Sequence, residues 1–250
     1  MIDAHCHLIE GKNKDIKLYL EESFHKNIKG IILNGYDLNS SKKVVEWAQK
    51  YNNVYAAIGI HPSYLDSFNQ KDFIKLEKLL LEPKVIAIGE IGLDYFKRQD
   101  NVLEQQKLFN QQLKLAKKYK KPVIIHNREA TSDVYKYLKK CKVQGLLHSY
   151  DDNLFWVNKF IKLNMLFGVG GLITFKNKES LREVIKKVPL EYILLETDSP
   201  YLTPEPFRGK ENHPSNLIYI ANKLAEIKDC SLGLIKEKTV SNAVGLFDLH

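Results

Sequence analysis

The sequence has few cysteines and no long apolar run, and each scarcity excludes a class of protein. Only three cysteines occur in 250 residues, and no two of them form a CxxC pair. This excludes both a disulfide framework and a zinc site built from thiolates. No apolar stretch approaches the roughly 20 residues of a membrane span, and the first residues read as a strand rather than as a signal peptide. We therefore expect a cytoplasmic protein without a membrane partner.

The region after the first apolar run also lacks a glycine-rich phosphate fingerprint, which argues against an open doubly wound sheet. Short runs rich in valine and isoleucine instead recur along the chain, starting near residues 2, 30, 54, 85, 123, 145, 165 and 192. Helical periodicity fills the segments between them, as in Val44, Trp47, Ala48 and Tyr51. Continuous apolar runs are typical of parallel strands buried on both faces. Eight strand–helix units predict an α/β fold, a TIM (β/α)8 barrel forming a single domain over residues 1–250.

Histidines and acids collect at or just past the ends of these runs. The set consists of His5, His7, His61, Glu90, His126, His148 and Asp198. Core histidines with a purely structural role would not all fall at the same end of successive strands. That end of a TIM barrel carries the catalytic residues, and imidazole and carboxylate are the usual ligands of zinc and manganese. The pattern predicts the metal centre of a hydrolase.

An HxH motif on a strand places both imidazoles on one face, about 6.6 Å apart along the chain, which suits one metal ion. The motif alone is a weak signal. With the later strand ends, however, the metal ligands number six: His5, His7, Glu90, His126, His148 and Asp198. Six ligands exceed the needs of one ion, so we expect two divalent ions (Mg, Mn or Zn), which a carboxylate can bridge.

The charge of the chain points toward an anionic substrate. The formal net charge is +8, which suits a polyanion, although a lysine-rich genome would explain the total equally well. Only four of the 38 basic residues are arginines, and Arg98, Arg128 and Arg208 lie in loops after predicted strands. Arginine can hold a phosphate through two hydrogen bonds, which lysine cannot. Surface ion pairs are the alternative role for each of them.

Seven segments carry a resemblance to a known family. They are DAHCHL, GIHP, GEIGLDY, PVIIHNREA, TFKN, LLETDSPYLTPEPFRGK and TVSNAVGLF, which occur in the family's order and spacing. In this combination the chain resembles the TatD-type metal-dependent deoxyribonucleases, within the wider amidohydrolase-like barrels, over essentially its whole length. The resemblance implies a divalent-metal phosphodiesterase that acts on DNA, often as an exonuclease.

The resemblance also implies roles for the site residues. One metal ion would be held by His5, His7 and Asp198. The second would be held by His126 and His148, with Glu90 between the two ions. His61 would sit beside the substrate phosphate. In the mechanism that we expect, His61 positions this phosphate or protonates the leaving oxygen, and Asp198 orients water or accepts its proton. We therefore take Asp198, Glu90 and His61 as catalytic candidates, and His61, Arg128, Arg208 and Arg98 as substrate-binding candidates.

The chain departs from the family's pattern at two places. Ser63 follows Pro62 where the family often has a histidine, and Ser149–Asp152 replaces a CFSG segment. His213, in the loop after the last strand, is a further candidate for substrate contact.

Two other functions remain open. A metal-dependent amide or lactone hydrolase on the same barrel is the enzymatic alternative, because one fold hosts many chemistries. A DNA-binding or scaffold protein is the non-enzymatic alternative, which the complete ligand set disfavours. DNA is thus the expected partner, and no obligate protein partner is evident.

Overall fold

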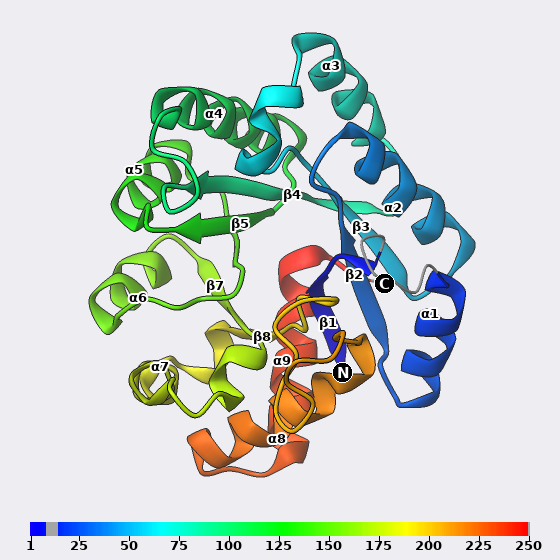
Figure 1. The fold of residues 1–250 in the computed structure, drawn as a ribbon, viewed down its shortest axis with the longest axis vertical. Coiled ribbons are helices and arrows are strands. Elements are labelled where there is room, and N and C mark those ends of the chain that lie inside the picture. Colours follow the sequence, from blue (N-terminus) through cyan, green and yellow to red (C-terminus); the bar gives the residue numbers. More distant parts are fainter. Residues whose placement is uncertain (9–14, 250) are drawn as a thin grey trace. The chain divides into compact units, whose positions relative to one another are not determined.

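Strands and helices alternate along the chain in the computed structural model, which describes residues 1–8 and 15–249. The strands are β1 (Ile2–Cys6), β2 (Gly30–Asn34), β3 (Val54–Ile58), β4 (Val85–Asp94), β5 (Val123–Arg128), β6 (Gly145–Leu147), β7 (Met165–Val169) and β8 (Ile193–Leu195). The helices are α1 (Ile16–His25), α2 (Leu38–Lys50), α3 (Gln70–Leu79), α4 (Val102–Tyr119), α5 (Thr131–Cys141), α6 (Leu154–Ile161), α7 (Glu179–Lys187), α8 (Leu217–Lys228) and α9 (Leu232–Phe247) (Figure 1). The predicted strand starts agree with the structure to within one residue. The last strand begins at Ile193 because Leu190–Tyr192 form a 3-10 turn.

The strands belong to one sheet, whose order follows the sequence from β1 to β8. The pairs β3–β4, β4–β5, β5–β6 and β7–β8 are parallel, and β1 contacts β8. A sheet of eight parallel strands that alternate with helices is a TIM (β/α)8 barrel. The predicted fold class is therefore confirmed.

The chain divides into two compact units. Unit 1 comprises Met1–Ile32, Ser149–Asn158 and Leu166–His250, and unit 2 comprises Leu33–His148 and Lys159–Met165. In unit 2, α4 and α5 flank the long strands β4 and β5 (Figure 1). The helices bury one apolar face each, as the periodicity predicts, and in α5 the buried residues are Val134, Leu138 and Cys141.

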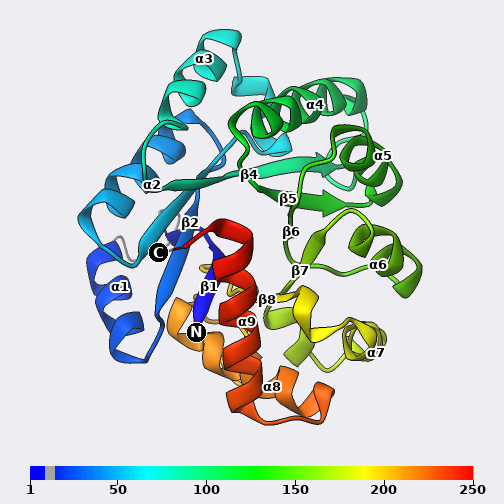
Figure 2. The same ribbon diagram turned by 180° about the vertical axis from the view of Figure 1, so that it is seen from behind.

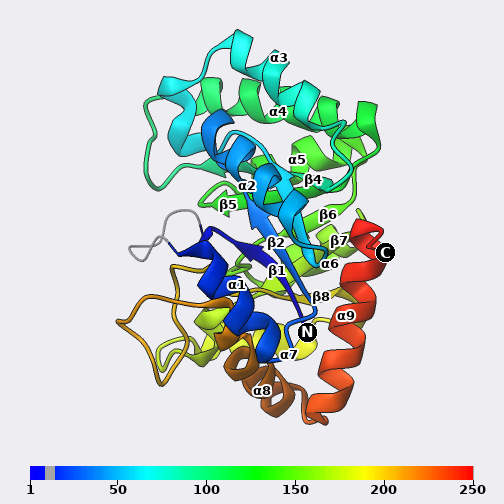
Figure 3. The same ribbon diagram turned by 90° about the vertical axis from the view of Figure 1, so that its right-hand side faces the viewer.

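In unit 1, helix α9 packs against β1 and β8. Its Asn242 amide donates hydrogen bonds of 2.8 Å to the carbonyls of Leu190 and Ile193, at the beginning of β8. Figures 2 and 3 show the same helix beside the N-terminal start of β1. Because α9 covers the beginnings of these strands, their carboxyl ends are left for functional side chains.

The structure bears on two features of the sequence, the lack of a long apolar run and the small number of cysteines. Among the residues that the structure describes, no helix combines the length and apolar character of a membrane span. The cytoplasmic location stays a prediction. The cysteines are free, and the buried Cys6 lies with its Sγ 3.6 Å from the Ile32 carbonyl oxygen. Cys6 is thus a packed core residue.

Candidate metal centre

Unit 1 brings together the first three predicted ligands. His5 lies in β1, His7 follows this strand, and Asp198 lies three residues past β8. The His5 Nε2 atom lies 3.0 Å from His7 Nε2 and 3.4 Å from an Asp198 carboxylate oxygen, and His7 Nε2 lies 3.8 Å from the same oxygen. All three residues are buried. Two imidazoles and one carboxylate therefore point at a single spot.

This spacing can be tested against the geometry of a metal site. Ligand atoms about 2.1 Å from one ion in tetrahedral arrangement are about 3.4 Å apart. The three observed separations, 3.0, 3.4 and 3.8 Å, bracket this value. Burial of such polar side chains is costly unless they are paired or bind an ion. The three residues therefore fit the divalent ion that the donor chemistry implies, and we call them the unit 1 ligand group.

The loop that carries Asp198 is fixed by an aspartate on β1 that the sequence analysis did not select. The Asp3 carboxyl group accepts a 2.8 Å hydrogen bond from the Thr197 backbone N–H and lies 2.5 Å from the Thr197 hydroxyl. In addition, the Asp198 N–H donates to the His5 carbonyl, and Asp198 has a positive φ of 56°, a conformation that aspartate tolerates better than most residues. Burial raises the pKa of Asp3 to about 8, so Asp3 is mostly protonated at neutral pH.

Unit 2 brings together the other predicted ligands around Glu90. One Glu90 carboxylate oxygen lies 2.9 Å from His126 Nδ1 and 3.8 Å from His148 Nε2. The same oxygen lies 3.6 Å from His61 Nε2. The ligand atoms of His61, Glu90 and His126 lie within 4.8 Å of one another, which is close enough to hold one ion. We call Glu90, His126 and His148 the unit 2 ligand group.

His61 differs from the others in the state of its ring. Its Nδ1 accepts a 3.1 Å hydrogen bond from the Ser63 backbone N–H, at one of the two departures from the family's pattern. A neutral imidazole that accepts at Nδ1 carries its proton on Nε2. In that tautomer the nitrogen that faces Glu90 is a hydrogen-bond donor, and in the other tautomer it could join Glu90 and His126 around an ion. The tautomer with the proton on Nε2 fits the role beside a phosphate that the resemblance implies.

Asp94 is a second functional residue that the sequence analysis missed. Its carboxylate lies 3.1 Å from His126 Nε2 and also accepts a hydrogen bond from the Lys97 backbone N–H. Burial alone would raise the pKa of Asp94, but the hydrogen bonds from His126 and Lys97 lower it to about 2. A carboxylate behind a histidine ligand fixes the orientation of the ring and raises its basicity. Asp94 therefore holds Nε2 of His126, and Nδ1, beside Glu90, is the atom that could bind an ion.

The protonation of His126 responds to these two acids. Burial by itself lowers the pKa of His126, but the hydrogen bonds to Asp94 and Glu90 outweigh it and raise the pKa above the usual value. A metal ion that binds Nδ1 has to displace a proton, so binding at this group weakens as the pH falls.

The close approach of β4 and β5 depends on a glycine of the GEIGLDY segment. Gly92 has a φ of 152°, and a Cβ atom there would lie 1.9 Å from the His126 carbonyl oxygen. The register of β4 against β5 shifts between Ile88 and Ile91, so Glu90 lies at an irregularity inside β4 and not after the strand as expected. The remaining ligands lie within the last two residues of a strand or up to three residues past one, except His126, which is the fourth of six residues in β5.

The three selected arginines differ in their surroundings. Arg128 lies with its guanidinium 3.8 Å from the centre of the Phe96 ring, and Arg208 lies 4.2 Å from the centre of the Phe175 ring. Neither forms an ion pair with a described residue. Arg98, in contrast, forms ion pairs with Asp66 and Asp100, so it would have to exchange these partners to bind a phosphate.

Two other residues noted in the sequence have local partners. His213 accepts a hydrogen bond from the Ser215 N–H, packs against the Tyr19 ring and lies 3.4 Å from Glu22. These contacts give it a structural role at the start of a 3-10 turn. Asp151, one of the extra acids after His148, forms an ion pair with Lys178.

Comparison with known proteins agrees with this arrangement. The chain matches the family described as TatD related DNase over residues 2–248. It is 36% identical over 254 residues to the metal-dependent hydrolase YabD of Bacillus subtilis, with 100% of both chains covered. The crystal structure of YjjV, a TatD homologue from Escherichia coli, superposes with a TM-score of 0.95 at 31% identity and covers 100% of this chain and 98% of that one. A TatD family hydrolase from Entamoeba histolytica, at 26% identity, gives a TM-score of 0.88, covering 100% and 98% of the two chains.

The ligand groups, the barrel and the match along the chain lead to one assignment. The chain belongs to the TatD related DNase family and is a metal-dependent hydrolase.

Proposed function

We propose that the protein hydrolyses phosphodiester bonds in DNA, as an exonuclease that uses one divalent ion at each ligand group. The substrate class is supported by Arg128, an exposed arginine that forms no ion pair with a described residue, although its charge helps to lower the pKa of Asp94. The Arg128 guanidinium stacks on the Phe96 ring, which orders this group. The N–H donors at the edge of the guanidinium can then bind a phosphate. The description of the family as a DNase supports the same substrate.

The ligand residues divide the chemistry between them. A divalent ion supplies the positive charge that activates water and stabilises negative charge on a phosphate. Asp198 combines a negative charge with a fixed position, since hydrogen bonds on both sides hold its backbone. We assign it the role of orienting the water and accepting its proton. That all six ligands form one centre stays a prediction, which a metal-loaded crystal structure tests.

His61 and the arginines act on the substrate. The proton on His61 Nε2 can be donated to a phosphate oxygen or to the leaving oxygen. Arg128 and Arg208 offer planar forks that hold backbone phosphates without reading the bases. Arg98 stays a predicted phosphate ligand, and its two aspartate partners make it the costliest of the three to recruit.

The proposal is tested by incubating the protein with end-labelled single-stranded DNA and Mg²⁺, Mn²⁺ or Zn²⁺, with EDTA as the metal-free control. We expect metal-dependent release of mononucleotides from one end. The same preparations are offered simple lactones and acyl amides. Efficient turnover of these compounds, without release of nucleotides from DNA, would refute the nuclease and leave an amide or lactone hydrolase.

A further inference from the structure

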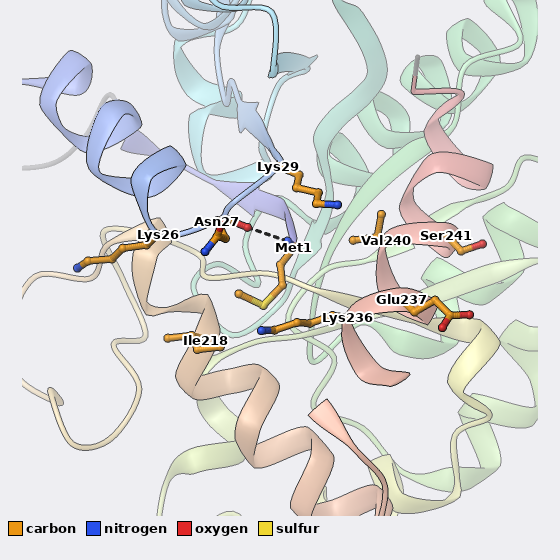
Figure 4. A pocket seen from close by; sticks show the side chains of 9 residues that line it. All are labelled: Met1, Lys26, Asn27, Lys29, Ile218, Lys236, Glu237, Val240 and Ser241. Carbon is orange, nitrogen blue, oxygen red and sulfur yellow. Dashed lines mark hydrogen bonds between the residues drawn. The ribbon is translucent and has the colours of Figure 1, made fainter. Parts of the chain in front are cut away.

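A pocket of about 940 Å³ lies in unit 1, outside both ligand groups. Its walls come from the start of β1, the segment between α1 and β2, and helices α8 and α9 (Figure 4). It lies at the beginning of β1, whereas His5 and His7 lie at the end of this strand. At about 3.3 Å per residue, Met1 and His5 are about 13 Å apart along the strand. The pocket is therefore a separate site within its unit.

The charges in this pocket are unbalanced. Three lysines and one acid line it: Lys26, Lys29, Lys236 and Glu237. Within residues 1–8 and 15–249, the side chains of Lys29 and Lys236 form no ion pair or hydrogen bond, whereas the Lys26 Nζ atom is 3.4 Å from the Ser215 hydroxyl. Figure 4 shows Lys29 and Lys236 on either side of the Met1 side chain, and the Glu237 carboxylate points away from both. Two ammonium groups thus flank one hollow without a counter-charge.

The remaining walls are mostly apolar. The thioether side chain of Met1 forms the middle of the hollow, and Ile218 and Val240 lie at its sides (Figure 4). Asn27 and Ser241 add neutral polar groups at the rim. Ligand sites of this size are typically apolar with a few polar groups that fix the ligand's orientation. An inorganic ion would use only the lysines and leave the apolar wall in contact with water.

We propose that this pocket binds a small organic phosphate of about the size of a mononucleotide. The phosphate group lies between Lys29 and Lys236, which act as point charges. The apolar or aromatic part of the ligand covers Met1, Ile218 and Val240. The site is independent of the proposed nuclease activity, because none of its lining residues belongs to a ligand group.

The methionines provide a local probe. The chain has two: Met1 lines the pocket, and Met165 is fully buried at the start of β7. With ¹³C-methyl methionine, titration with thymidine 5′-monophosphate is expected to shift the Met1 methyl signal in a saturable way and leave Met165 unchanged. Thymidine lacks the phosphate group, and inorganic phosphate lacks the apolar part. Each should therefore bind at least about tenfold more weakly than thymidine 5′-monophosphate.

Three substitutions make the test specific. Lys29→Gln and Lys236→Gln should each weaken thymidine 5′-monophosphate binding at least about fivefold. Lys238→Gln, on the same helix but outside the pocket, should not change it. Lys29 is exposed outside any helix or strand, so its substitution leaves folding intact and stands as evidence even if the Lys236 variant unfolds.

Three results would overturn the proposal. The first is a Met1 signal that does not move at about 5 mM ligand and low salt. The second is a shift that persists unchanged in both pocket variants. The third is equal affinity for inorganic phosphate, which would show an adventitious ion only.

Discussion

The two ligand groups are each supported by a buried aspartate, but in opposite ways. In unit 1, Asp3 bonds to the backbone and hydroxyl of Thr197, and burial raises its pKa to about 8. In unit 2, Asp94 bonds directly to the His126 ring, and despite its burial its pKa falls to about 2. The difference follows from the partner. A hydroxyl and an amide do not offset the desolvation of a carboxylate here, whereas a histidine that gains charge does.

This contrast separates two functions of one residue type. The protonated Asp3 holds the loop of Asp198 in place without adding negative charge beside the unit 1 ligand group. The ionised Asp94 places a negative charge beside the His126 ring, which would strengthen the hold of this ring on a metal ion. We therefore expect Asp3 to act on folding and Asp94 to act on metal affinity, and the predictions below test that division.

The largest effect is expected from removing the charge of the unit 1 carboxylate. Asp198→Asn keeps the size of the side chain but removes both a ligand and the proposed proton acceptor. Activity on DNA should fall at least about a hundredfold, with little change in the Tm of the metal-free protein. The matched control is Asp229→Asn, an exposed residue with a similar φ of 51°. Near wild-type activity of Asp198→Asn would show that Asp198 is structural.

The next effect compares the two supporting aspartates directly. Asp94→Asn should weaken metal binding about 10- to 100-fold, because a neutral amide polarises His126 less than a carboxylate does. Asp3→Asn should leave metal affinity within about twofold, since an amide oxygen can still accept the hydrogen bond from the Thr197 N–H, and the side chain stays neutral. Calorimetric titration with Zn²⁺ measures both constants without any activity assay. An equal loss of metal affinity in the two variants would show that Asp3 and Asp94 support their ligand groups in the same way.

A smaller effect is expected at the arginines. Arg128→Lys keeps the charge but loses the fork, so DNA cleavage should slow by about fivefold to tenfold. The loss should be similar for DNA of different sequence, because the contact is to the backbone phosphate. Arg98→Lys provides the comparison, and it should have less effect because Arg98 already pairs with two aspartates. Sequence-dependent losses at Arg128 would indicate a contact to bases instead.

The sequence predicts the fold well because its signals are local. Most strands are short apolar runs, and helices such as α2 follow a 3.6-residue period. The six predicted metal ligands lie in or next to strands, so the order of the strands in the barrel is enough to predict at which strand each one lies. The exact place of Glu90 was not predictable, because the irregularity in β4 depends on its pairing with β5.

The supporting residues escaped prediction for a different reason. Asp3 and Asp94 lie inside the segments DAHCHL and GEIGLDY, but their role depends on Thr197 and His126, which are 194 and 32 residues away. One signal was present nevertheless. Asp3 lies two residues before His5, and Asp94 lies four residues after Glu90, so an even spacing along a strand marked both. The ion pair of Arg98 with Asp66, 32 residues away, had no such signal.

The smallest expected effect is the pH dependence that Asp3 gives to folding. The pKa of Asp3 is about 8 in the folded protein and 3.8 as the ordinary value, so the folded state binds the proton more tightly. Its contribution to stability is complete below pH 3.8, declines as the pH rises, and is lost once the pH passes about 8. Asp3→Asn cannot ionise and should escape this decline. In EDTA, the Tm of the variant minus that of the wild type should increase from pH 5 to pH 8 and then level off, while Asp229→Asn should show no such trend. A difference that stays constant with pH would mean that the folded protein holds Asp3 ionised, and its support of the Asp198 loop would then resemble that of Asp94 for His126.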